Sequence, residues 1–237
     1  MSSKKLMSGG GDRQAGELHI VGTRKSIREA LYIDGPAGQL ETLLEVPKHI
    51  DRHMVAVLCH PHPQHQGTMM NKVVHTLSRS MNDLGIPAVR FNFRGVGTSE
   101  GTYAGGIGET DDVLAVIEWA QKRYNDADLC LLGFSFGGMV ACRAALTARP
   151  KQLVSVAPAV SNMSALLNGA QPDCPWLVVQ GDADEMVSCD ALLEWFNQLE
   201  PGPELIVLPE VSHFFHGNLT LLRETVVSHL ENSWGAE

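Results

Sequence analysis

Short apolar runs alternate along this chain with segments of helical periodicity, and this alternation constrains the fold more than any other feature. Clear examples of such runs are Met54–Cys59 (MVAVLC), Leu129–Leu132 (LCLL) and Trp176–Gln180 (WLVVQ). Almost wholly apolar runs of this length are typical of strands that are covered on both faces. Strands that alternate with helices predict a parallel sheet with helices on both faces, which is an α/β fold.

The chain from Arg28 to Val46 departs from this pattern. Two extended segments, EALYI and LETLLEV, flank a turn signal of sequence DGPAG at 34–38. They predict an antiparallel hairpin at the start of the sheet. With three further runs at Pro87–Phe93, Leu153–Ala157 and Leu205–Leu208, we expect a mostly parallel sheet of eight strands.

Apolar residues at intervals of three and four predict the intervening helices. These helices are expected near 74–84, from Thr110 or Asp111 to Ala120, and near 136–148, 192–199 and 219–230. The segment between 157 and 176 has room for one helical turn at 163–167 but not for a large lid domain. The sequence therefore predicts little or no lid and an open site.

Length and composition favour one domain. A chain of 237 residues with 44% hydrophobic residues can bury a substantial core without dividing into two domains. We expect this domain to span 17–237 and to follow a flexible, glycine-rich and polar tail at 1–16. The tail lacks the apolar core of a secretion signal, and no run is long enough to span a membrane.

Charge and cysteine usage limit the expected partners and location. The net charge of −9 argues against a nucleic-acid partner, and no basic cluster indicates binding to a membrane surface. Five cysteines without regular spacing are typical of free thiols in a reducing compartment. We therefore predict a cytoplasmic protein, and nothing in the sequence indicates an oligomeric state.

The segment Gly133-Phe134-Ser135-Phe136-Gly137 matches the pattern G-x-S-x-G between an apolar strand and a helix. In that context the serine sits on a tight turn above the carboxyl ends of the strands. Glycine is favoured on either side of it because the turn brings backbone segments close together. The free N–H groups of the following helix can stabilise an oxyanion. Ser135 is thus predicted to be a nucleophile.

A serine hydroxyl needs a base, and the base needs a carboxylate to orient it. His213 lies in VSHFFHG before the final helix, and is preferred over His216 as the base. Asp184 lies in GDADEMV after a strand, and is preferred over Asp182, which directly follows a glycine and suits a turn. Glu185 in the same segment is the third choice. The order serine, acid, histidine is the order expected on this fold.

Two backbone N–H groups are expected to form an oxyanion hole. The residue after the nucleophile, Phe136, supplies the first. The second should come from the loop HPHPQHQG at 60–67, where Pro61 and Pro63 have no N–H to donate. His62 is the preferred donor there, with Gln64 next.

Taken together, these motifs resemble those of the α/β-hydrolase superfamily, and in particular compact bacterial hydrolases similar to dienelactone hydrolases and acyl-peptidase domains. The motifs are HPHP at 60–63, FNFRGVGTSEG at 91–101, GFSFGG at 133–138, GDADEMV at 181–187 and HFFHG at 213–217. The resemblance implies a Ser135–Asp184–His213 triad. It leaves the substrate open among esters, lactones, thioesters and peptides.

Two other kinds of function fit parts of the sequence. His60, His62 and His65 have a spacing that could hold a zinc ion, which would make the protein a metal-dependent hydrolase. A non-catalytic binding protein on the same fold is the other alternative, although its expected mark is the loss of a triad residue. Arg90, Arg94 and Glu109 are interpreted as structural, with Arg94 organising its glycine-rich loop.

The function predicted from the sequence is hydrolysis of a small carboxylic ester, lactone or thioester through an acyl-enzyme on Ser135. The expected partner is a small acyl substrate. The chemistry requires no metal and no cofactor.

Overall fold

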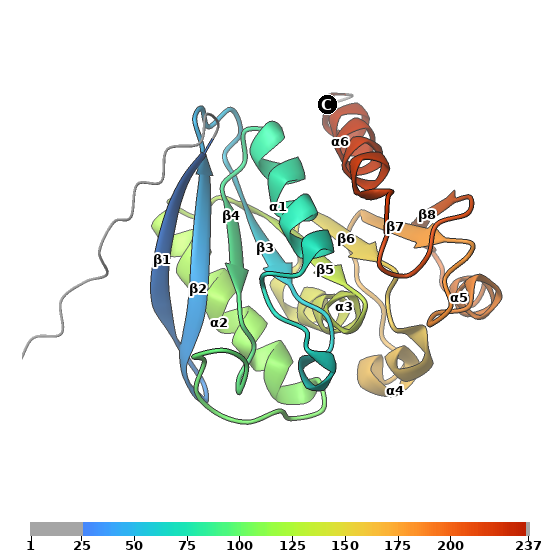
Figure 1. Cartoon of the computed structure of the whole chain (residues 1–237), viewed down its shortest axis with the longest axis horizontal. Coiled ribbons are helices and arrows are strands. Elements are labelled where there is room, and N and C mark those ends of the chain that lie inside the picture. The colour runs from blue at the N-terminus through green and yellow to red at the C-terminus, as the bar shows by residue number, and fades with distance from the viewer. Residues whose placement is uncertain (1–25, 236–237) are drawn as a thin grey trace, which may run out of the picture.

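The computed structural model describes residues 26–235, which form one eight-stranded sheet flanked by helices (Figure 1). The predicted tail at 1–16 lies outside the described residues. The strand order is β1-β2-β4-β3-β5-β6-β7-β8. The α/β fold, the eight strands and the mostly parallel pairing predicted from the sequence are confirmed.

Strand pairing follows the sequence prediction closely. The strands are β1 (Ser26–Gly35), β2 (Gly38–Pro47), β3 (Met54–Cys59), β4 (Ala88–Phe91), β5 (Asp128–Phe134), β6 (Gln152–Val156), β7 (Trp176–Gly181) and β8 (Glu204–Leu208). The hairpin β1–β2 is antiparallel, and β2 joins β4 in antiparallel register. From β4 to β8 every pairing is parallel. The carboxyl ends of these strands therefore lie at one edge, where open α/β sheets bind ligands.

Helices cover both faces of the sheet, as Figure 1 shows. They are α1 (Lys72–Asp83), α2 (Ile107–Arg123), α3 (Phe136–Ala148), α4 (Met163–Leu167), α5 (Cys189–Phe196) and α6 (Leu219–Gly235), with 3₁₀ turns η1 (Pro63–His65) and η2 (Val160–Asn162). One face packs against α1 and α6, and the other against α2 and α3. Only η2 and α4 lie between β6 and β7, so the prediction of no large lid is confirmed.

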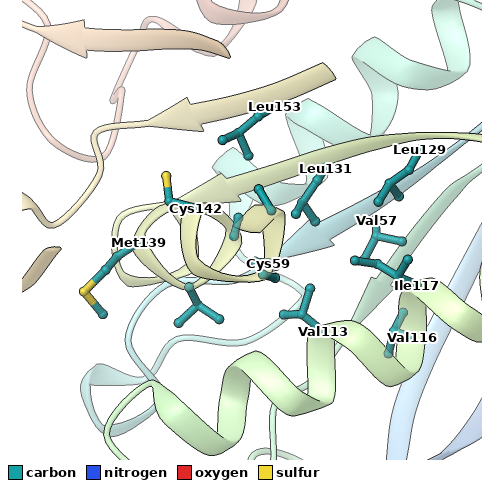
Figure 2. Packing of buried hydrophobic residues seen from close by; sticks show 14 of the residues in the cluster. Val57, Cys59, Val113, Val116, Ile117, Leu129, Leu131, Met139, Cys142 and Leu153 are labelled. Carbon is teal, nitrogen blue, oxygen red and sulfur yellow. The ribbon is translucent and has the colours of Figure 1, made fainter. Parts of the chain in front are cut away.

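Apolar side chains of the helices pack against the strands in two layers, one on each face of the sheet. In the layer drawn in Figure 2, Val113, Val116 and Ile117 of α2 face strands β3 and β5, and α3 packs beside them. The strand residues on this face include Val57 and Leu131, both fully buried. No helix within residues 26–235 has the length and apolar composition that a membrane span requires.

Helix α2 begins earlier than the sequence analysis predicts. It starts at Ile107 rather than at Thr110 or Asp111. The reason is Glu109, whose buried carboxylate accepts hydrogen bonds from the backbone N–H groups of Ala104 and Gly106, each at 2.7 Å. These bonds satisfy donors at the helix start that would otherwise lack partners. The expected structural role of Glu109 is confirmed.

A buried ion pair joins the hairpin to the central sheet. Arg90 on β4 and Glu45 on β2 are 1% and 2% exposed, and Arg90 Nε lies 2.9 Å from Glu45 Oε2. The Ser78 hydroxyl also donates to this carboxylate, and Arg90 donates to the carbonyl of Met69 at 2.6 Å. Arg90 is thus structural, as predicted, and it fixes the segment just after the 60–67 loop.

We expect Arg90→Met to lower the free energy of unfolding by about 3 kcal/mol, the low end for a broken buried ion pair, because Glu45 loses its buried partner and keeps only the more exposed Arg28 at 2.8 Å. Urea denaturation at neutral pH measures the effect. Arg79→Met, which changes an exposed arginine of α1, is the matched control. Equal stability of the two variants would show that the buried pair contributes nothing.

Candidate active site

Ser135 occupies a strained turn between β5 and α3. Its φ and ψ are 55° and −118°, outside the regions that most residues prefer. The turn is held by its backbone, since Ser135 N–H donates to Val156 at 2.9 Å and its carbonyl accepts from Met139 and Ala159. The side chain is consequently lifted to the carboxyl edge of the sheet.

Close backbone contact explains the second glycine of the motif. A Cβ atom at Gly137 would lie 2.3 Å from the carbonyl oxygen of Cys59 and 2.5 Å from that of His60. Such distances are far below van der Waals contact, so a larger residue would displace α3 from β3. The first turn of α3 therefore lies directly against the start of the 60–67 loop.

The structure brings the three predicted residues together. His213 Nε2 lies 3.1 Å from Ser135 Oγ, and His213 Nδ1 lies 2.8 Å from Asp184 Oδ2. The side chains of His213 and Asp184 are both 1% exposed. With Nδ1 protonated and donating to the carboxylate, Nε2 is free to accept the serine proton.

Asp184 is held in its ionised form by several donors. Burial acts to raise the pKa of this carboxyl, but hydrogen bonds from His213 and from the N–H groups of Val187 and Met186 outweigh it. The pKa of Asp184 therefore lies below its usual value. The anion can orient His213 and stabilise its protonated form.

The competing residues have other contacts. Asp182 is exposed, and its carboxylate accepts from Glu210 N at 2.6 Å rather than from a histidine. Glu185 accepts from the backbone N–H of His213 at 3.2 Å, and so holds the loop but not the ring. His216 is exposed, and its backbone carbonyl accepts from the side chain of Asn218.

The two expected oxyanion donors lie beside Ser135. Phe136 is the first residue of α3, and its ring packs on that of His62 with centroids 4.8 Å apart. Within residues 26–235, neither backbone N–H has a hydrogen-bond acceptor. Gln64, the second choice in the loop, uses its N–H to donate to His62 Nδ1 at 3.2 Å. Of the two candidates in the loop, only His62 keeps a free donor.

His60 cannot serve a metal together with His62 and His65. Its ring is fully buried, with Nδ1 2.6 Å from the carbonyl of Pro61 and Nε2 accepting from Phe93 N–H at 3.0 Å. Both nitrogens are therefore engaged, while the rings of His62 and His65 stack on one another at 4.5 Å. Among the described residues, no group of three or more His, Cys, Asp or Glu is arranged to hold a metal. The interpretation of 60–65 as a metal site is wrong.

Arg94 organises its loop, as predicted. Its guanidinium donates to both oxygens of the buried Asp112, and its backbone N–H donates to the same carboxylate at 3.0 Å. Bidentate pairing of this kind fixes the guanidinium in one orientation. Arg94 is thereby committed to the glycine-rich segment after β4.

A cavity of about 610 Å³ opens above Ser135 and His213. One wall is the 61–67 part of the histidine-rich loop. The opposite wall is largely apolar and comes from η2, α5 and the loops beside them, with Val160, Met186, Trp195 and Phe214 among its side chains. Its volume suits a small-molecule ligand.

The same residues relate this chain to known proteins. Residues 34–171 match the family model of the X-Pro dipeptidyl-peptidases (S15 family), which is more than half of the chain. The chain belongs to the S15 family. The matched region contains Ser135 but ends before Asp184 and His213. An uncharacterized protein of Rickettsia prowazekii is 32% identical over 195 residues, covering 78% of this chain and 81% of its own.

Solved structures place this S15-family chain in the α/β-hydrolase superfamily. A Xanthomonas campestris protein described as an α/β serine hydrolase without a lid is 41% identical, with a TM-score of 0.82 over 90% of this chain and 96% of its own. An α/β serine hydrolase homologue from Coxiella burnetii is 44% identical, with a TM-score of 0.81 over 85% and 97%. The superfamily predicted from the sequence is confirmed, and the chain is a serine hydrolase. The finer likeness to dienelactone hydrolases stays a prediction.

Sequence reasoning missed several residues of this hydrolase's site. Gln180, fully buried at the end of β7, donates to Asp184 Oδ2 at 2.9 Å, which is the oxygen that also faces His213. The apolar wall was not foreseen because its residues come from separate segments. In the structure the wall is marked by exposed apolar side chains, since Met186 and Phe214 remain 56% and 38% exposed.

His60 makes the folding stability of this S15-family hydrolase depend on pH in a testable way. Burial lowers the pKa of His60 to about 4 from 6.5, so the unfolded chain takes up a proton between pH 6.5 and 4 that the folded protein does not. This contribution to stability is complete above about pH 6.5 and is lost as the pH falls toward 4. From pH 7 to pH 5 we expect the wild type to lose about 2 kcal/mol more unfolding free energy than His60→Gln.

Urea denaturation of both proteins at the two pH values measures that difference. Since the other histidines are unchanged, their contribution cancels in the comparison. An equal loss in wild type and His60→Gln would contradict the account of His60 as a buried neutral ring.

Proposed function

We propose that this protein hydrolyses a small carboxylic ester, lactone or thioester through an acyl-enzyme on Ser135. The observation that carries the proposal is the hydrogen-bonded series Asp184–His213–Ser135, with distances of 2.8 and 3.1 Å, at the floor of an open cavity. Nucleophile, base and orienting carboxylate in this order constitute the machinery of acyl transfer.

The first step forms the acyl-enzyme. Ser135 Oγ attacks the substrate carbonyl carbon as His213 Nε2 accepts the hydroxyl proton. The tetrahedral oxyanion is stabilised by the N–H groups of Phe136 and His62, which have no acceptor within residues 26–235. His213 then returns the proton to the departing alcohol or thiol, and the bond to the leaving group breaks.

The second step releases the acid. Water enters the cavity, His213 takes its proton, and the hydroxide attacks the acyl carbon. The bond to Ser135 breaks, and the serine oxygen recovers a proton from His213. Asp184 stays ionised throughout, as its lowered pKa requires.

The openness of the site supports a small acyl substrate. Only short elements lie between β6 and β7, and the wall formed by Met186, Trp195 and Phe214 offers apolar surface to an acyl or leaving group. The family name favours a second candidate, which is cleavage of a peptide bond after proline. Glu194, the one carboxylate within residues 26–235 that lines the cavity, could pair with the amino terminus of such a peptide.

Matched chromogenic substrates separate the two candidates. We expect kcat/KM for p-nitrophenyl butyrate and for a butyryl thioester to exceed that for alanyl-prolyl-p-nitroanilide, with all turnover lost in Ser135→Ala. Equal or faster cleavage of the anilide would instead favour the peptidase. Near-wild-type ester hydrolysis by purified Ser135→Ala would contradict the role of Ser135.

Substitution of two aspartates in the same loop tests which of them is the acid of the triad. Asp184→Asn removes the charge that orients His213, and we expect kcat for p-nitrophenyl butyrate to fall by roughly 10⁴-fold. Asp182→Asn alters only the contact with Glu210 N, and its kcat should stay within about threefold of wild type. A larger loss in Asp182→Asn would show that Asp184 is not the acid.

We also propose a cytoplasmic location, which rests on the cysteines. All five are free, and three of them, Cys59, Cys130 and Cys142, are buried. Burial raises the pKa of these thiols, so they stay protonated and unreactive. Free thiols in this number are typical of a reducing compartment.

A further inference from the structure

A second cavity lies beside the first and shares two residues with it. It has a volume of about 290 Å³, and both cavities are lined by His62 and Phe136. Ser135 lines the larger cavity, so a substrate bound there has the smaller cavity next to it, beside the shared residues His62 and Phe136. Its apolar surface comes from Ile107, Met139 and Leu166.

Helix α3 runs from the nucleophile to this cavity along one face. Ser135 precedes the helix, and Met139 and Arg143 follow at intervals of four, so the three lie on one side of it. Arg143 is about 12 Å from Ser135 along the helix axis. Long side chains on a helix lean toward its N-terminus. Arg143 lines the cavity, and we expect its side chain to lean toward Ser135 for this reason.

Arg143 of α3 differs in its pairing from Arg90 of β4 and from Arg94 in the loop after β4. Arg90 is paired with Glu45, and Arg94 with Asp112. Arg143 is half-buried, and no carboxylate within residues 26–235 pairs with it. A guanidinium stays charged at all physiological pH values, and its planar donors fit the two oxygens of a carboxylate. The guanidinium that lines the cavity therefore has no carboxylate partner among the described residues. The carboxylate that acts on the cavity is the buried Glu109, which adds to the effect of burial in raising the pKa of Tyr103.

Tyr103 contributes a second donor. His62 Nδ1 accepts from Gln64 N–H, which places the proton of the neutral ring on Nε2. The pKa of His62 is lowered by burial and by His65, so the neutral form dominates at neutral pH. His62 Nε2 lies 3.3 Å from the Tyr103 oxygen and donates to it. The Tyr103 hydroxyl proton then has no acceptor within residues 26–235 and is available to a ligand in the cavity.

We propose that this cavity, defined by Tyr103, Met139, Arg143 and Leu166, is an anionic subsite for the substrate. It would accept an arm that is apolar next to the scissile carbonyl and ends in a carboxylate, bound by the Arg143 guanidinium and the Tyr103 hydroxyl. The net charge of −9 gives the protein no general attraction for anions, so any preference has to arise locally. The proposal rests on the proposed esterase function, and deepens it by naming a substrate class.

Two matched ester series test the subsite. In the first, the acyl chain carries the charge, as in mono-p-nitrophenyl glutarate against its methyl ester. In the second, the leaving group carries it, as in 4-acetoxybenzoate against methyl 4-acetoxybenzoate. The quantity compared is the ratio of kcat/KM for the anionic ester to that for its neutral partner.

We expect Arg143→Gln to lower this ratio by at least about fivefold in one of the series, since it removes a charge-assisted pair in a partly desolvated cavity. Arg79→Gln, an exposed arginine on α1, should leave the ratio at the wild-type value. A change smaller than about fivefold in both series overturns the subsite. So does an equal decrease in Arg79→Gln.

A binding measurement separates failure of the subsite from failure of the esterase proposal. Phenylglyoxal modifies arginines, and peptide mass spectrometry reports the modification at Arg143 with and without glutarate. We expect glutarate to protect Arg143 in the wild type, and to protect it less in Tyr103→Phe. If neither ester is hydrolysed, the esterase proposal fails while protection still supports the subsite. Modification of Arg143 that glutarate does not slow overturns the subsite whatever the activity.

Discussion

The close approach of α3 to the end of β3 is the constraint on which the rest of the site depends. At Gly137 the helix backbone lies so near the carbonyls of Cys59 and His60 that a Cβ atom has no room. This contact places the nucleophile turn against the histidine-rich loop. It also brings Phe136 close to His62, with ring centroids 4.8 Å apart, and the backbone N–H groups of both residues have no acceptor within residues 26–235. Small changes in that packing would move nucleophile and oxyanion donors relative to one another.

Buried polar groups fix the other parts of the site in position relative to this contact. His60 ties the histidine-rich loop to the segment after β4 by bonding the backbone of Pro61 and Phe93. On the far side of Ser135, Gln180 and two backbone N–H groups fix Asp184. Among the described residues the side-chain oxygen of Gln180 has no hydrogen-bond partner, but the donors and acceptors that hold His60 and Asp184 are paired inside the protein, so the geometry exists before a substrate arrives. A preorganised site does not have to reorient its dipoles during the reaction.

Much of this arrangement could be predicted from the sequence, because it depends on short local motifs or on the order of the motifs along the chain. The run MVAVLC at 54–59 fixes a buried strand, and GFSFG at 133–137 fixes a strand, turn and helix. The order of Ser135, Asp184 and His213 then predicts the site. What could not be predicted depends on contacts between distant segments. The zinc interpretation of His60, His62 and His65 failed because spacing does not show that Phe93 N–H occupies one ring nitrogen of His60. The lone charge of Arg143 was invisible for the same reason, since the sequence does not show which cations find a carboxylate.

Covalent labelling shows whether Ser135 is an activated nucleophile. A fluorophosphonate probe reacts with activated serines, and peptide mass spectrometry locates the adduct. We expect a single adduct on Ser135 that forms at a much lower rate in a folded His213→Ala variant. An adduct on another serine, or no adduct on folded wild-type protein, would contradict it.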